Sequence, residues 1–151
     1  IEGMIANVGR PLFSSDTPLI RAVGNGECGV GLVNTYYVAR MLAGDSGRAD
    51  QQLAGRLKVV FPDPAHVNIS GAGVVKTSRH PQAALKLIEF LASPSGGRGY
   101  AEANNEYPLR GTGNNPILKR FGPFRADGVS AEQLGAKNKQ AVKLMEANGW
   151  R

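Results

Sequence analysis

The chain has 151 residues, of which 42% are apolar, so it is long enough for one domain with a core and too apolar for a disordered chain. Its single cysteine, Cys28, excludes an internal disulfide or a zinc site built on several of its own cysteines, and no apolar run approaches the ~18 residues of a membrane span. The formal net charge is +6, but the basic residues are scattered without an RNA-binding or helix-turn-helix signature, so no nucleic-acid partner is expected.

The first third of the chain predicts two helices with a strand between them. Residues 14–26 carry capping residues at their start and glycines at their end, which predicts a short helix. The apolar run 28–34 is bounded by turn residues and predicts a buried strand. Asn34 or Thr35 can then cap a further helix that Gly44 closes.

The rest of the chain continues the alternation of predicted strands and helices. The polar segment 45–56 predicts no definite element, whereas 58–61 predicts a strand and 66–75 a second extended segment. Three later stretches predict helices from their opening prolines or capping residues and their apolar spacing: 81–93, 94–104 and 130–148. Because strands alternate with helices, the predicted fold class is α/β.

Two adjacent tyrosines, Tyr36 and Tyr37, lie where the predicted strand passes into the helix. Tyrosines are common packing residues, and neighbours on a regular helix point ~100° apart, so a structural role is the ordinary interpretation. At a strand-to-helix junction, however, the backbone is irregular and two neighbouring side chains can converge. The junction also offers free backbone N–H groups to an anion, and ligands of open α/β sheets bind beyond the carboxyl ends of strands.

Two phenols held together suit a hard, highly charged cation. A free phenol has a pKa of about 10, but a bound trivalent ion displaces its proton and favours the phenolate. Oxygen ligands of this kind match ferric iron better than Cu(I) or Zn(II), which prefer sulfur or imidazole. Two ligands do not fill an octahedral shell, so other residues, water or a bound anion must supply the rest.

Three stretches of the sequence carry a resemblance to a known family. They are NTYYVARML at 34–42, the run from His66 to Leu109 that includes NISGAG and EYP, and the run 124–150. Together they resemble the ferric-iron-binding periplasmic proteins of bacterial ABC transporters, and the likeness extends over nearly the whole chain.

The resemblance implies a periplasmic-binding-protein type II fold, in which two α/β lobes close on a ferric ion and present it to the membrane subunits of the ABC transporter. It implies that Tyr36 and Tyr37 are ligands of Fe(III). It also implies a synergistic anion, such as carbonate or phosphate, beside Asn34, with Asp16 at a second position where some members hold the anion. An acid at that position would repel an anion.

Members of this family are about twice as long as this chain. The chain is therefore expected to be the C-terminal portion, with most of the second lobe in 1–65 and 111–151 and part of the first lobe, with a hinge strand, in 66–110. Such a portion exposes strand edges and apolar surface, so it is expected to associate with itself or with the missing N-terminal half.

Two alternatives remain open from the sequence. The same fold can bind an anionic or organic solute, with the tyrosines stacking or donating hydrogen bonds, and a basic nucleic-acid-binding module is a more distant possibility. His66 and His80 have no partner at ligand spacing, and Tyr100 and Tyr107 are interpreted as packing residues. No catalytic motif is present, so an enzyme is not expected.

Overall fold

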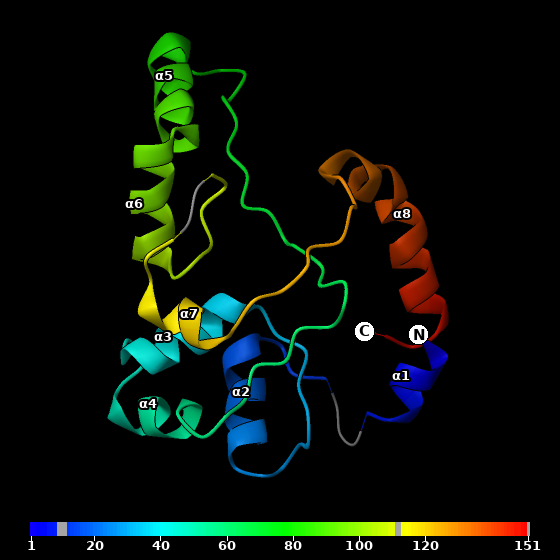
Figure 1. Cartoon of the computed structure of the whole chain (residues 1–151). Helices are drawn as coiled ribbons and strands as arrows, with labels where there is room; N and C mark the ends of the chain where they lie inside the picture. The colour runs from blue at the N-terminus through cyan, green and yellow to red at the C-terminus, as the bar shows by residue number, and fades with distance from the viewer. Residues whose placement is uncertain (9–11, 111–112, 151) are drawn as a thin grey trace.

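The computed structural model describes residues 1–8, 12–110 and 113–150, and every regular element within these residues is a helix (Figure 1). In chain order the helices are α1 (Glu2–Ala6), α2 (Asp16–Gly24), α3 (Thr35–Ala43), α4 (Arg48–Ala54), α5 (Pro81–Ala92), α6 (Pro94–Asn104), α7 (Pro116–Arg120) and α8 (Ala131–Ala147). Long extended segments carry the chain between groups of helices (Figure 1).

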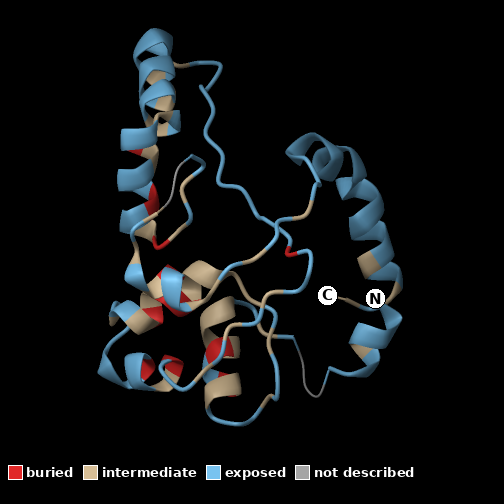
Figure 2. Ribbon diagram, viewed as in Figure 1, coloured by how far each residue is buried: buried red, intermediate tan, exposed pale blue. Residues whose placement is uncertain are grey.

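Helices α2, α3, α4 and α7 pack together around the main core. Its buried members are Ile20 of α2, Val38 and Met41 of α3, and Ala54 of α4. Figure 2 shows buried residues in these helices and in α6, whereas α8 is exposed along most of its length. Helix α3 contacts the other three helices, so it is the element that the core fixes most firmly.

Helix α3 begins and ends where the sequence predicts. Asn34 is its N-cap residue with an extended backbone, and Gly44 ends it in the left-handed region at φ 93°. Val38 and Met41 are three residues apart, so they lie on one face, and that face is buried. This burial fixes the rotation of α3 and therefore the directions in which its first-turn side chains point.

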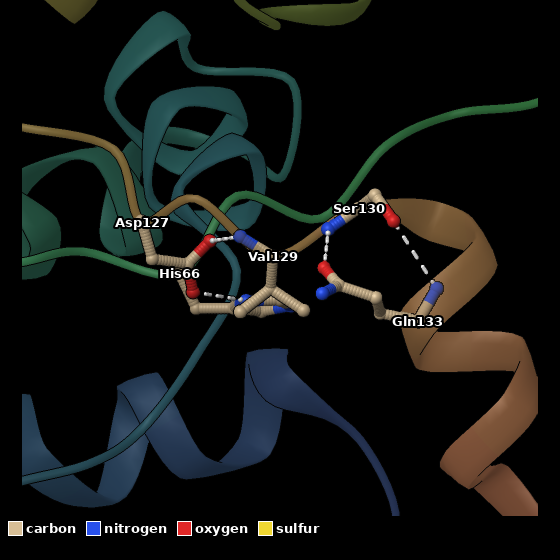
Figure 3. A network of polar contacts seen from close by, with 5 residues as sticks. All are labelled: His66, Asp127, Val129, Ser130 and Gln133. Atoms are coloured by element: carbon tan, nitrogen blue, oxygen red, sulfur yellow. Dashed lines mark hydrogen bonds and ion pairs between the residues drawn. The ribbon is translucent and has the colours of Figure 1, made fainter.

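The three later helices are also confirmed. α5 and α6 each carry a proline in their first turn and pack against each other. At the start of α8 the Ser130 hydroxyl accepts a hydrogen bond from the backbone N–H of Gln133 at 3.2 Å, and the Gln133 side chain accepts one from the backbone of Ser130 at 2.8 Å (Figure 3). This is the capping box that the sequence predicts.

The predicted strands at 28–34 and 58–61 are not formed within the described residues, and 66–75 is extended without a strand partner. A strand exists through a ladder of backbone hydrogen bonds to a neighbouring strand, and no such ladder joins these segments within the described residues. Some of their apolar side chains remain in solvent, since Val30 is 86% exposed and Val60 is 74% exposed, whereas Val33 and Val59 pack against the core. The sequence pattern therefore marks apolar segments suited to a sheet, but the described residues contain no sheet.

Helices α4 and α7 are not clearly predicted from the sequence. In α4 the buried Asp50 accepts two hydrogen bonds from Arg21 of α2, from Nε at 2.9 Å and from Nη2 at 2.7 Å. The two residues lie 29 positions apart in the chain, so local propensity does not reveal their contact. For α7 a local signal did exist, because Asn115 caps the helix and Pro116 takes its first position.

Two extended segments, one at Ala65 and one at 125–127, are joined by backbone hydrogen bonds. Ala65 exchanges backbone hydrogen bonds with Arg125 and Asp127, both at 2.8 Å, and forms an isolated parallel bridge with Ala126. His66 Nδ1 lies 2.8 Å from Asp127 Oδ2 (Figure 3). The partner of His66 thus lies 61 residues away in the chain, at a distance that sequence spacing does not reveal.

We expect Asp50→Asn to destabilise the chain at neutral pH by about 1–3 kcal/mol, the usual contribution of hydrogen bonds between charged groups. The hydrogen bond from Arg21 lowers the pKa of Asp50 in the folded state. The stabilisation is therefore complete above the unfolded pKa of about 3.9 and is lost as the pH falls through the lower folded value. Urea unfolding of the chain and the variant at pH 7 and at pH 3 measures it. An equal difference at both pH values would contradict the ion pair as its source.

Candidate metal-binding site

The two tyrosines converge on the first turn of α3. The ring centroids of Tyr36 and Tyr37 are 4.4 Å apart, and their planes are tilted by 36°. Both residues lie within α3 itself, where neighbouring side chains leave the axis ~100° apart, so the two side chains lean toward each other without the irregular backbone that the sequence suggests. The pair therefore presents two phenol groups side by side.

The two rings differ in their support. Tyr37 packs against the core cluster, whereas Tyr36 does not belong to that cluster. Both side chains are half-buried. The core thus holds Tyr37, and Tyr36 packs against Tyr37. Both side chains remain partly accessible to solvent.

Arg40 lies one turn later and covers both rings. Its guanidinium carbon is 5.2 Å from the ring centroid of Tyr36 and 5.9 Å from that of Tyr37, within the range of cation–π contacts. A positive charge here favours the phenolate over the phenol. Sequence reasoning missed Arg40, although its spacing of three and four residues from the tyrosines on a predicted helix was a usable signal.

The pKa of Tyr36 is raised to about 12. The largest cause is the hydrogen bond with Tyr37, followed by burial and by the charges of Tyr37 and Asp16, and Arg40 opposes them. Tyr36 is therefore a neutral phenol at physiological pH. A cation that binds here must displace its proton, which favours ions of high charge.

Asn34 and Asp16, the two residues predicted to hold an anion, are bonded to each other. Asp16 Oδ2 accepts the backbone N–H of Asn34 at 2.9 Å and its side-chain Nδ2 at 3.0 Å. The side chain of Asn68 in turn donates to Asn34 Oδ1 at 3.3 Å. The starts of α2 and α3 are thereby joined within reach of the tyrosines, and the extended segment 66–75 joins them through Asn68.

The other side chains weighed from the sequence lie elsewhere. His80 is the N-cap residue of α5, and Tyr107 packs edge-on against Phe124 with ring centroids 5.2 Å apart. Tyr100 is 47% exposed on α6. Across the described ranges, no group of three or more His, Cys, Asp or Glu side chains could hold a metal ion. The tyrosine pair is therefore the candidate metal site in this part of the chain.

Comparison with known proteins finds relatives that bind or take up iron. The chain is 38% identical to iron uptake protein A1 of Synechocystis sp., over 99% of the chain and 43% of that protein. It is 36% identical to the major ferric iron-binding protein of Neisseria meningitidis serogroup B, over 93% of the chain and 42% of that protein. It is 28% identical to the Fe(3+)-binding periplasmic protein of Serratia marcescens, over 91% of the chain and 40% of that protein. No family model matches the chain.

The fold is also shared with solved structures. The Bordetella ferric binding protein superposes with a TM-score of 0.86 and 34% sequence identity, over 99% of this chain and 49% of that structure. The chain thus has the fold of one part of the ferric-binding proteins, the predicted periplasmic-binding-protein type II fold. It spans less than half the length of these relatives, as expected for one portion of a longer protein. Of the helices in the described ranges, none is long and apolar enough to cross a membrane.

We expect Tyr37→Phe to lower the pKa of Tyr36 from about 12 toward the ordinary value of about 10. The substitution removes the hydrogen bond that contributes most to the shift and leaves a ring of nearly the same shape. Ultraviolet detection of phenolate during an alkaline titration measures the change. Tyr107→Phe is the control, because burial raises the pKa of Tyr107 independently of the pair. An unchanged late titration in Tyr37→Phe would refute the hydrogen bond between the two phenols.

Proposed function

We propose that this chain, a homologue of one part of the ferric-iron-binding proteins, contributes two phenolate ligands to a ferric-ion site of a periplasmic solute-binding protein. The observation that carries the proposal is the convergence of Tyr36 and Tyr37, with ring centroids 4.4 Å apart, on the first turn of α3. The proposed role is capture and release of the ion for import, which requires no chemical reaction.

The chemistry of the pair supports a ferric ion. Both phenols must lose their protons to bind a metal, and only an ion of high charge pulls a proton from a group whose pKa is about 12. Anionic oxygen ligands then match Fe(III) in hardness. Arg40 balances part of the negative charge that the phenolates create and holds both rings in place.

The rest of the coordination shell must come from outside the tyrosine pair. The named sources are further protein ligands, water, and a synergistic anion such as carbonate or phosphate at the Asn34 end of α3. The backbone N–H and Nδ2 of Asn34 are the donors that such an anion would use, and Asp16 is bonded to both.

The extended apolar segments that form no strand pairs within the described residues favour a further portion of protein that pairs with this chain. Val30, Leu32 and Val60 expose most of their surface, and apolar side chains of this kind are buried when a strand enters a sheet. We propose that these side chains are buried against the N-terminal half, the portion of the relatives that this chain does not span. In that arrangement 1–65 and 111–151 form most of the second lobe and 66–110 reaches the first. Residues 111–112 at the last boundary lie outside the described residues.

The closed form of the two lobes would be the form that the membrane subunits of an ABC transporter receive. The compartment proposed is the periplasm, which the name of the Serratia marcescens relative includes.

Titration of the chain with a chelated ferric salt should produce a visible absorption band that grows to saturation. Charge transfer from phenolate to iron produces such a band, and an organic or anionic solute would give none. Tyr36→Phe and Tyr37→Phe should each weaken the band and lower the affinity for iron by roughly tenfold or more, as loss of a ligand requires. Tyr100→Phe is the matched control, since this tyrosine is exposed on α6 and should leave the band unchanged.

The same titration on the chain joined to the N-terminal portion of iron uptake protein A1 tests the complete site. There the band should be stronger and the affinity higher, because the joined portion supplies further ligands. A joined protein that stays colourless with ferric salt, or one whose band is the same in both tyrosine variants, would end the proposal.

A further inference from the structure

We infer that Asn105 is a positioning residue for the tyrosine pair, which it supports through the Asn115 cap of α7. The inference rests on the proposed function, since iron binding at the pair is the property that Asn105 would affect. Asn105 acts through α7 and α3 rather than on the metal itself.

Asn105 is set apart by its backbone conformation and its burial. It ends α6 in the left-handed region, at φ 57° and ψ 40°, and among the described residues it is the only one other than glycine with a positive φ. Glycine takes this conformation without strain, as Gly44 does at the end of α3. Asn105 is also only 8% exposed, and a buried polar side chain requires a hydrogen-bond partner. An asparagine at a position that suits glycine therefore indicates a role for its amide group.

The partner of this amide is the residue that caps α7. Asn115 Nδ2 donates to Asn105 Oδ1 at 2.9 Å, although the two residues are ten positions apart. Asn115 Oδ1 accepts the backbone N–H of Ile117 at 2.9 Å and that of Leu118 at 3.3 Å. Because the amide nitrogen only donates and the oxygen only accepts, the bond to Asn105 determines which atom faces the first turn of α7. Asn105 thus joins the end of α6 to the start of α7 and orients its cap.

Helix α7 connects this cap to the element that carries the tyrosines. It has five residues, too few to be stable without a cap and packing. It packs against α3, and its Leu118 is 4% exposed. Phe121, directly after α7, packs against the same core cluster as Tyr37. That cluster includes Val38 and Met41, whose burial fixes the rotation of α3, so the position of α7 affects how the tyrosine pair is held.

The test substitutes both ends of the bond. Asn105→Gly keeps the left-handed conformation without strain but removes the acceptor, and Asn115→Ser keeps a capping oxygen but removes the amide donor. Each should lower the affinity for a chelated ferric salt roughly two- to tenfold, the range set by one hydrogen bond of ordinary net strength. The two substitutions combined should cost no more than either alone, because both remove the same bond.

Two further variants separate this role from a general loss of stability. Asn105→Asp keeps an acceptor and tolerates the left-handed region, so it should keep most of the affinity that Asn105→Gly loses. Asn104→Ala removes the neighbouring amide, whose Nδ2 donates to the Tyr100 carbonyl at 2.9 Å within α6, and should leave the affinity unchanged.

A second readout needs no iron. Hydrogen exchange at the backbone amides of Ile117 and Leu118 should be roughly two- to tenfold faster in Asn105→Gly, because the cap of α7 is no longer held in place. The same variant should change the near-ultraviolet circular dichroism of the tyrosine pair, whose ring centroids are 4.4 Å apart. Asn104→Ala should alter neither signal.

The outcomes distinguish the inference from the proposed function. If the chain forms the coloured complex and Asn105→Gly binds iron as tightly, the inference is overturned and the proposed function stands. The inference is also overturned if Asn104→Ala lowers the affinity as much as Asn105→Gly does. If neither the chain nor the joined protein gives a coloured complex, while Asn105→Gly still changes the exchange in α7 and the signal of the tyrosine pair, the positioning role stands and the ferric role is refuted.

Discussion

The contact between Asp16 and Asn34 is the constraint on which the candidate site depends. It ties the first residue of α2 to the cap of α3 and so fixes where the first turn of α3 begins. The core then fixes the rotation of the helix, and the two phenols converge as a consequence. A single carboxylate thus contributes to the backbone geometry at the start of α3 and to the charge beside the phenols.

The molecule combines a well-packed group of helices with extended segments in which apolar side chains such as Val30 and Val60 are exposed. The core around Met41 supports Tyr37, while Val30 and Val60 face solvent. Strands at 28–34 and 58–61 do not form within the described residues, and the chain spans less than half the length of the relatives that it matches. The chain supplies the tyrosines and their supporting contacts.

Local rules decide which features could be predicted from the sequence. The cap and glycine of α3, the capping box of α8 and the adjacency of the tyrosines are all readable within a few residues. The predicted strands are not formed, because a strand depends on a partner that no local pattern supplies. The pairs Arg21–Asp50 and Asp16–Asn34 lie 29 and 18 residues apart, so only the fold brings them together. The contact of Arg40 with both rings depends on how the tyrosines converge, which its helical spacing alone does not determine.

The most direct measurement is resonance Raman spectroscopy of the ferric-loaded chain, excited in the visible band. We predict enhanced ring vibrations of tyrosinate bound to iron. One component should disappear in Tyr36→Phe and another in Tyr37→Phe, because the two rings differ in their packing against the core and in their distance from Arg40. A ferric complex without tyrosinate vibrations, or with vibrations that survive in both variants, would show that iron binds elsewhere and would contradict the proposed site.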